Sequence, residues 1–186
     1  MKLNTLLYLP FSTHEGWLEI ERIHPRLLKL FAFIVLPLSL LPPLMVYYAG
    51  THYPEAFLPQ GLAKDWAAVA AAFFLTEVFT LLVMGWLIKQ VAETNTLRID
   101  YHDAYLLASI SPIPLWLSSL ALFVPSLSFN VVVSLAAIGL SCSIIYHGIE
   151  GLGHTGEDMA AANVVQTVIG IGLIAWALML VLVIMM

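Results

Sequence analysis

The chain has 186 residues, of which 61% are hydrophobic and only 10% are charged, whereas an average soluble domain is roughly half apolar and a quarter charged. Its mean hydropathy of +0.93 is more than a water-soluble fold can hide. Seven basic against twelve acidic residues, a net charge of −5, exclude the clustered positive face of a nucleic-acid-binding protein. A single cysteine, Cys142, excludes a disulfide framework. The composition indicates an integral membrane protein.

Five stretches of the chain are long and uncharged enough to cross a bilayer. A hydrocarbon core about 30 Å thick needs roughly 20 residues of helix, each rising 1.5 Å. The windows that meet this length with almost no charge are about 27–48, 66–88, 104–123, 127–146 and 162–186. Val124, Pro125 and Ser126 form a minimal turn between the third and fourth windows. The sequence predicts five transmembrane helices.

The apolar character on every face of these stretches excludes a membrane barrel. Barrel strands are about 10 residues long and alternate polar with apolar side chains, whereas Ile169 to Met186 is apolar throughout. The connections between the windows are too short for a soluble domain. We therefore expect an all-α polytopic membrane protein, with residues 1–186 forming a single domain.

The distribution of Lys and Arg predicts the orientation in the membrane, because short cytoplasmic connections are enriched in basic residues. Lys64 lies on one side of the predicted bundle. The other basic residues lie on the opposite side: Lys2, Arg22, Arg26, Lys29, Lys89 and Arg98. This asymmetry predicts an inner (plasma) membrane protein with a cytoplasmic N-terminus and a C-terminus outside. Residues 1–10 lack a small-residue cleavage site, so we do not expect a cleaved signal peptide.

The segment 1–26, ahead of the first window, is predicted to contain a short interfacial helix. Ser12 and Glu15 have the spacing of a capping box, which favours a helix from about Thr13 to His24, ended by Pro25. Trp17 is predicted to be a membrane-surface anchor at headgroup depth. Two alternatives stay open: a helix tucked against the bundle, which the acidic composition favours, and a lipid sensor or docking site.

The order of features along the chain resembles the Yip-type (Ypt-interacting protein) membrane domain family in its bacterial form. That family has a Trp and Ile pair before a proline, then five transmembrane helices. Its third helix has alanine and proline near its start, and its fourth ends in an aromatic residue and a glycine before a loop that leads to small residues. The matching residues here are Trp17, Ile20 and Pro25; Ala104, Ala108, Pro112 and Pro114; Tyr146 and Gly148; and Ala160 to Ala162.

This resemblance implies a membrane scaffold or adaptor, not an enzyme. Eukaryotic relatives are associated with Rab-type GTPases, vesicle trafficking and membrane shaping. A protein or lipid partner is then expected at the cytoplasmic face, formed by residues 17–26 and the gaps 89–103 and 147–161. Signatures of serine hydrolases, phosphate-binding loops and zinc metalloproteases do not occur in the sequence.

Glu77 is an acid near the middle of the second window, about 11 residues from its start. An ionised acid at that depth costs about 3 kcal/mol on insertion scales, so it must face the bundle, take a proton or find a donor. One hypothesis is a proton- or cation-linked residue of a small transporter or channel component. The sequence favours the other, a neutral carboxyl that is hydrogen-bonded across helices.

The clearest candidate for a metal-binding motif in the chain consists of His147, Glu150 and His154. On one helix these positions share a face, and two imidazoles with a carboxylate suit zinc or another divalent ion. In the transporter hypothesis this group is a metal gate; in a third hypothesis it makes the protein a metal-responsive sensor. The glycines nearby weaken a helix and favour instead a solvated cytoplasmic turn without a cofactor.

Prolines and glycines inside the predicted helices indicate kinks and close helix packing. Pro37, Pro42 and Pro112 are expected to kink the first and third helices, because each removes a backbone donor. Gly170 and Gly172 suit close packing of the fifth helix against another helix, which is consistent with a homo-oligomer.

Overall fold

Five helical spans make up the described part of the protein. The computed structural model describes residues 17, 26–57, 64–152 and 158–186. Within these residues the regular structure is entirely helical, and five spans are long and apolar enough to cross a membrane: Leu27–His52, Trp66–Thr94, Tyr101–Phe123, Leu127–Leu152 and Ala160–Met185. The predicted all-α fold with five transmembrane helices is confirmed. The predicted interfacial helix, Trp17 aside, lies outside the described residues.

The first span is irregular where its prolines lie. Pro37 and the pair Pro42 and Pro43 cannot donate to the helical ladder, and the span is divided into α3 (Leu27–Leu30), a π-helix η1 (Phe31–Val35), α4 (Leu36–Ser39) and α5 (Leu41–His52). The wide π turn lets Leu30 and Val35 both pack in one cluster with Leu81 and Trp116. A short 3-10 helix, η2 (Pro54–Ala56), follows.

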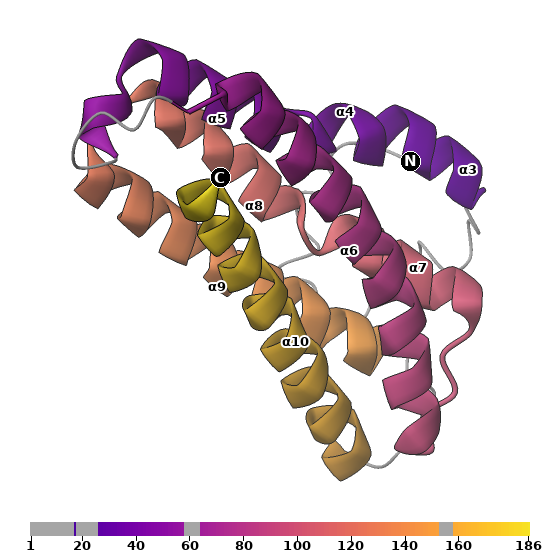
Figure 1. Cartoon of the computed structure of the whole chain (residues 1–186). Helices are drawn as coiled ribbons and strands as arrows, with labels where there is room; N and C mark the ends of the chain where they lie inside the picture. Colours follow the sequence, from indigo (N-terminus) through magenta and orange to yellow (C-terminus); the bar gives the residue numbers. More distant parts are fainter. Residues whose placement is uncertain (1–16, 18–25, 58–63, 153–157) are drawn as a thin grey trace.

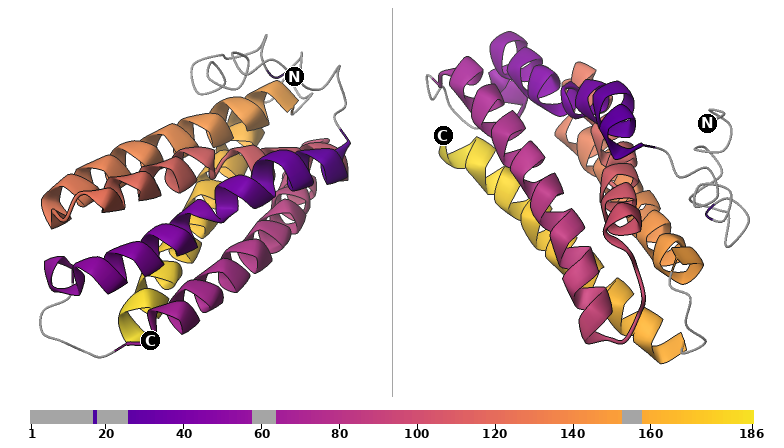
Figure 2. Two further views of the ribbon diagram at one scale, coloured as in Figure 1. Left: turned by 90° about the horizontal axis from the view of Figure 1, so that it is seen from above. Right: turned by 90° about the vertical axis from the view of Figure 1, so that its right-hand side faces the viewer.

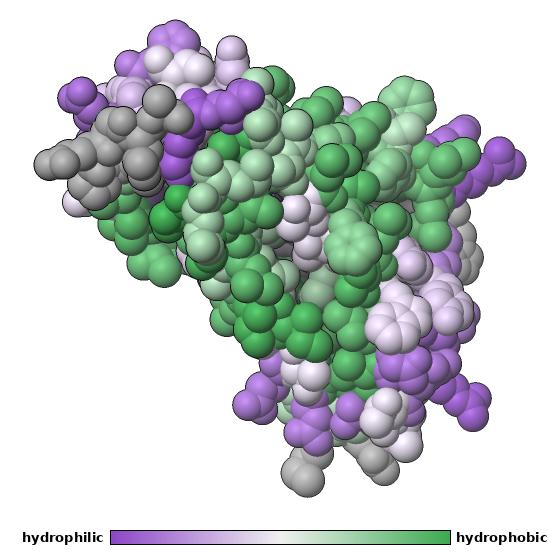
Figure 3. Space-filling view, viewed as in Figure 1, coloured by the Kyte–Doolittle hydropathy of each residue, from purple (hydrophilic) through white to green (hydrophobic). Residues whose placement is uncertain are grey.

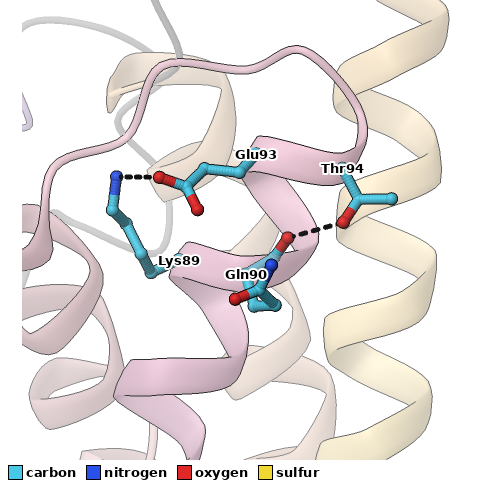
Figure 4. Close-up of polar contacts among 4 residues, drawn as sticks. All are labelled: Lys89, Gln90, Glu93 and Thr94. Atoms are coloured by element: carbon cyan, nitrogen blue, oxygen red, sulfur yellow. Dashed lines mark hydrogen bonds and ion pairs between the residues drawn. The ribbon is translucent and has the colours of Figure 1, made fainter.

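The second span, α6 (Trp66–Thr94), runs about six residues beyond the predicted end at residue 88. Asp65 caps its start, since Oδ1 accepts from the backbone N–H groups of Ala67 and Ala68 at 3.1 and 3.2 Å. Its last turns carry local polar contacts (Figure 4): Lys89 Nζ lies 2.7 Å from Glu93 Oε1, and Thr94 Oγ1 donates to the Gln90 carbonyl at 2.8 Å. These contacts allow the helix to continue into the polar connection.

The third span begins at Tyr101, three residues before the predicted start, and is broken near Pro112. It consists of α7 (Tyr101–Ile110), α8 (Ile113–Ser118) and the 3-10 helix η3 (Ser119–Phe123). Helical hydrogen bonding resumes directly after the break, because the Trp116 N–H donates to the Pro112 carbonyl at 2.9 Å. The break turns α8 and places Trp116 in the interior, where it is 3% exposed.

The turn between the third and fourth spans lies at residues 124–126, as predicted. Asn130, in the first turn of α9 (Leu127–Leu152), stabilises it. The Asn130 amide donates to the Val124 and Ser126 carbonyls at 2.9 and 2.8 Å. This buried amide therefore adds side-chain hydrogen bonds to carbonyls that already accept from the backbone N–H groups of Ser126 and Asn130.

The last helix, α10 (Asp158–Met185), lies beside α6 (Figure 1). Its final carbonyls accept from Lys64, whose Nζ donates to Val183 O at 2.9 Å and to Ile184 O at 2.5 Å. A cation at this position complements the partial negative charge of a helix C-terminus.

Buried apolar side chains concentrate at one end of the bundle, which we name the packed end. It lies where α6, α9 and the N-terminal part of α10 meet α7, and Figure 2 shows these helix ends from two directions. Its buried members are Trp17, Ile88, Ala92, Leu97, Ile99, Ala104, Leu106, Leu107, Ala108, Ile110, Ile144, Ile145, Ile149, Leu152, Val164, Val165 and Val168. The opposite end holds fewer buried apolar residues.

The outside of the bundle is apolar between polar extremities. In Figure 3 hydrophobic residues cover most of the visible face, and hydrophilic ones gather towards its limits. Large apolar side chains such as Phe33, Leu75 and Ile174 are 78%, 68% and 62% exposed. Such a surface suits lipid, and it fits a multi-pass membrane protein.

Candidate functional site

A cavity of about 170 Å³ lies between α6, α8, α9 and α10, next to the packed end. Its wall is mostly apolar, with aromatic side chains from Phe73, Trp116 and Trp176. A few polar side chains also line it: Glu77, Thr80, Ser111 and Ser141. An apolar pocket with a small number of converging polar groups is the usual form of a ligand site.

Glu77 reaches this cavity from the middle of α6 and is 7% exposed. Its side chain lies near Trp116 of α8, which lines the same cavity, and Oε2 has no hydrogen-bond partner among the described residues. Thr80, one turn away, donates to the Thr76 carbonyl of its own helix at 2.7 Å. The neighbouring threonine therefore donates to its own helix and not to Glu77.

Ser141 of α9 is the second unsatisfied polar group of the cavity. It is 6% exposed, and its Oγ has no hydrogen-bond partner in the described part of the chain. No sequence motif singles out this serine. Ser141 lies 14 residues after the start of α9 at Leu127, and Glu77 lies 11 residues after the start of α6 at Trp66. Both helices start at the same end of the bundle, so the two residues lie at comparable depth. This depth is the signal by which the sequence could have paired them.

Trp17 is enclosed by protein in the packed end and is 0% exposed. It lies on two glycines of α9: a Cβ added at Gly148 would be 3.0 Å from Trp17 Cζ2, and one at Gly151 would be 2.8 Å from Trp17 Cβ. The sequence predicts that this indole anchors the chain at headgroup depth, which stays a prediction; in the structure the indole lies against α9, in one buried cluster with Leu107. These contacts favour the alternative of a segment tucked against the bundle.

The same contacts explain why α9 continues to Leu152, beyond the predicted end at residue 146. Gly148 and Gly151 weaken a helix, but here they allow the close approach of Trp17 and the packing of Ile149 and Leu152 in the core. Burial of these side chains offsets the low helix propensity of glycine.

The continued helix brings His147 and Glu150 onto one face, with Nδ1 and Oε2 3.9 Å apart. That separation is longer than a hydrogen bond. His154 lies outside the described residues, so the proposed three-residue metal site stays a prediction. Within the described ranges no group of three His, Cys, Asp or Glu side chains is close enough to hold a metal ion.

A second acidic and histidine pair lies at the start of α7. His102 Nδ1 is 3.3 Å from Asp103 Oδ1, and the Asp103 side chain is largely buried. Asp100 is exposed at the helix start. Asp103 therefore lies beside His102, whereas Asp100 faces solvent.

The geometry defines a class of protein: a five-span helical membrane protein with a tightly packed end and an apolar cavity inside the membrane-spanning region. The family model of the Yip1 domain matches residues 7–179. Because this match covers nearly the whole chain, the chain belongs to the Yip1 domain family, as its resemblance predicts. No curated protein and no solved structure matches the chain.

Proposed function

We propose that the protein is a non-enzymatic scaffold or adaptor of the inner (plasma) membrane that acts through protein or lipid contacts. Its membership of the Yip1 domain family, which is not known as enzymatic, supports this role. The observation that carries the proposal is the packed end, since it forms a fixed base beneath exposed charged side chains. A partner would meet a preformed surface there and not a flexible one.

The exposed charges around the packed end form the proposed partner surface, which we name the polar rim. Its members come from three spans and the connection between α6 and α7: Arg26, Lys29, Glu93, Arg98, Asp100 and Glu150. Mixed charges of this kind give an interface its specificity and rate of association more than its affinity. A protein partner with complementary charges fits this rim.

The same side chains support the proposed orientation. Arg26, Lys29 and Arg98 are exposed at the packed end, whereas Lys64, at the other end, is engaged with the carbonyls of α10. The excess of basic residues at the packed end favours a cytoplasmic location for it. The N-terminus is then cytoplasmic, and the C-terminus of α10 lies outside.

Site-specific crosslinking in living cells tests the adaptor role. A photoreactive amino acid placed at Arg98 or Glu150 is expected to give a discrete adduct with the same partner, because both positions lie on the polar rim. Glu55, exposed at the opposite end, is the matched control and is expected to give none. The absence of adducts from both rim positions, or identical adducts from Glu55, would contradict the proposal.

Self-association through α10 is tested in the same cells. A Cβ at Gly170 would meet no described atom within 4 Å, so this position is open to a second copy. A photoreactive residue at 170 that yields an adduct of two chains supports a homo-oligomer. Recovery of monomer alone from native membranes removes it.

The transporter hypothesis makes a different prediction. Purified protein in proteoliposomes would move protons or divalent ions, and Glu77→Gln would abolish the flux, since the amide cannot exchange a proton. We expect no such flux. Flux that is lost in Glu77→Gln would overturn the adaptor proposal.

A further inference from the structure

We propose that the cavity between α6, α8, α9 and α10 binds a neutral membrane lipid that carries a hydroxyl group, with the hydroxyl held between Glu77 and Ser141. The proposal stands on two unsatisfied oxygens, Glu77 Oε2 and Ser141 Oγ, that line one otherwise apolar cavity. It does not depend on the adaptor role, which concerns the polar rim at the end of the bundle.

Both oxygens belong to side chains that are more than nine-tenths buried, at 7% and 6% exposure. A buried polar group without a hydrogen bond destabilises the fold, and the few that occur in native proteins mark a ligand, an ion or a function. Lipid tails offer no hydrogen bond to these groups. Their placement on one cavity indicates a ligand that does.

The chemistry of the two groups favours a hydroxyl over an ion. A protonated carboxyl and a serine hydroxyl can each donate and accept, and a ligand hydroxyl matches both properties. Glu77 is the only Asp, Glu, Lys, Arg or His among the residues that line the cavity in the described structure. An anion would therefore lack a basic partner, and a hard cation would lack the several oxygen ligands that it needs.

The volume and lining indicate that the rest of the ligand is apolar. A single water occupies about 30 Å³, and apolar cavities near 150 Å³ accept a molecule such as benzene. The cavity, at about 170 Å³, holds more than one water, yet most of its wall cannot hydrogen-bond. A hydroxyl on an alkyl or ring body fills it better than water, and a longer chain extends from the partly open cavity into the bilayer.

Photolabelling of the full-length protein in lipid nanodiscs tests the proposal. The probe is a long-chain alcohol that carries a diazirine, and the matched probe is its methyl ether, which has lost the hydrogen-bond donor. Mass spectrometry of the labelled peptides locates the adducts. We expect saturable labelling of α6 and α9 peptides by the alcohol, and about tenfold weaker labelling by the ether, in keeping with lost hydrogen bonds.

A double variant and a pair of single variants sharpen this test. In the double variant Glu77→Leu with Ser141→Ala, the alcohol is expected to label no better than the ether. Gly172→Leu is expected to block both probes, because Gly172 lines the cavity. Gly170→Leu is the matched control on the same helix and is expected to leave labelling unchanged.

Gly172→Leu keeps the test decisive if the double variant does not fold. A Cβ at Gly172 would lie 3.9 Å from Met84 Cε, an ordinary contact, and one at Gly170 would meet no described atom within 4 Å. Equal labelling by alcohol and ether would overturn the proposal, because the cavity would then hold any acyl chain. Stronger labelling by a matched amine probe would also overturn it, in favour of a cation site.

A negative result here and a negative result for the adaptor are separable. Loss of alcohol labelling would leave the crosslinks from Arg98 and Glu150 in place. Conversely, absent crosslinks with specific labelling of the cavity would remove the adaptor role and keep the lipid site.

Discussion

The packed end and the half of the bundle around the cavity differ in how their helices meet. At the packed end, large apolar residues such as Trp17 and Ile149 are fully buried. Around the cavity, α10 lines an open space, and only 6% of its span window is buried. The packed end therefore fixes the arrangement of the helices, and the half around the cavity is left free to contact lipid or a ligand.

The largest expected effect is at the indole that closes the packed end. Trp17→Ala would leave a cavity over Gly148 and Gly151, and we expect it to lower the free energy of unfolding by about 3–5 kcal/mol. Thermal unfolding of the purified protein in mild detergent measures this. Trp86, which is 49% exposed on α6, is the control, and Trp86→Ala is expected to have a far smaller effect. Equal effects would remove the distinction between the two regions.

An intermediate effect is expected where α6 meets α7. A Cβ at Gly85 would lie 2.4 Å from Tyr105 Cδ1, so Gly85→Ala forces the ring or the helix to move and is expected to destabilise by about 1–3 kcal/mol. A Cβ at Gly139 would meet no described atom within 4 Å. Gly139→Ala on the outer face of α9 is therefore expected to stabilise by about 0.5–1 kcal/mol. The opposite signs are read from paired melting curves.

The smallest effect concerns the turn after α6. Thr96 has a φ of 65°, a conformation that disfavours a β-branched residue and suits glycine. Thr96→Gly is expected to raise stability by about 0.5–1 kcal/mol. The control, Thr94→Gly at the last residue of α6, is expected to lower it by a similar amount, since glycine weakens helices and the Thr94 hydrogen bond to the Gln90 carbonyl is lost. A loss of stability in both variants would show that the Thr96 side chain contributes contacts that outweigh the strain.

The five spans could be predicted because hydropathy is a local property of the sequence. Their ends were less well predicted: the second and fourth helices continue to Thr94 and Leu152, and the third begins at Tyr101. The fourth helix shows why, since Gly148 and Gly151 weaken a helix in isolation and are compensated only by Trp17, more than 100 residues earlier. Propensity alone does not contain that contact.

The candidate site could be predicted only in part for the same reason. Glu77 is conspicuous in the sequence as an acid inside an apolar stretch. In the sequence, nothing distinguishes Trp116 and Ser141 from other residues of their helices. The break near Pro112 and the packing of α9 bring both to the same cavity. Depth along each span could have paired Ser141 with Glu77, but which faces converge depends on the tertiary arrangement.

The π turn Phe31–Val35 has a consequence for how the first span presents its charged start. Each residue advances an α-helix by about 100°, and a π turn accommodates an extra residue relative to an α turn. Removing one residue from this turn would rotate Arg26 and Lys29 by roughly that angle about the helix axis while α5 stayed in place. The direction in which these two cations point from the bundle is thus set by a backbone irregularity that begins two residues after Lys29 in the same span.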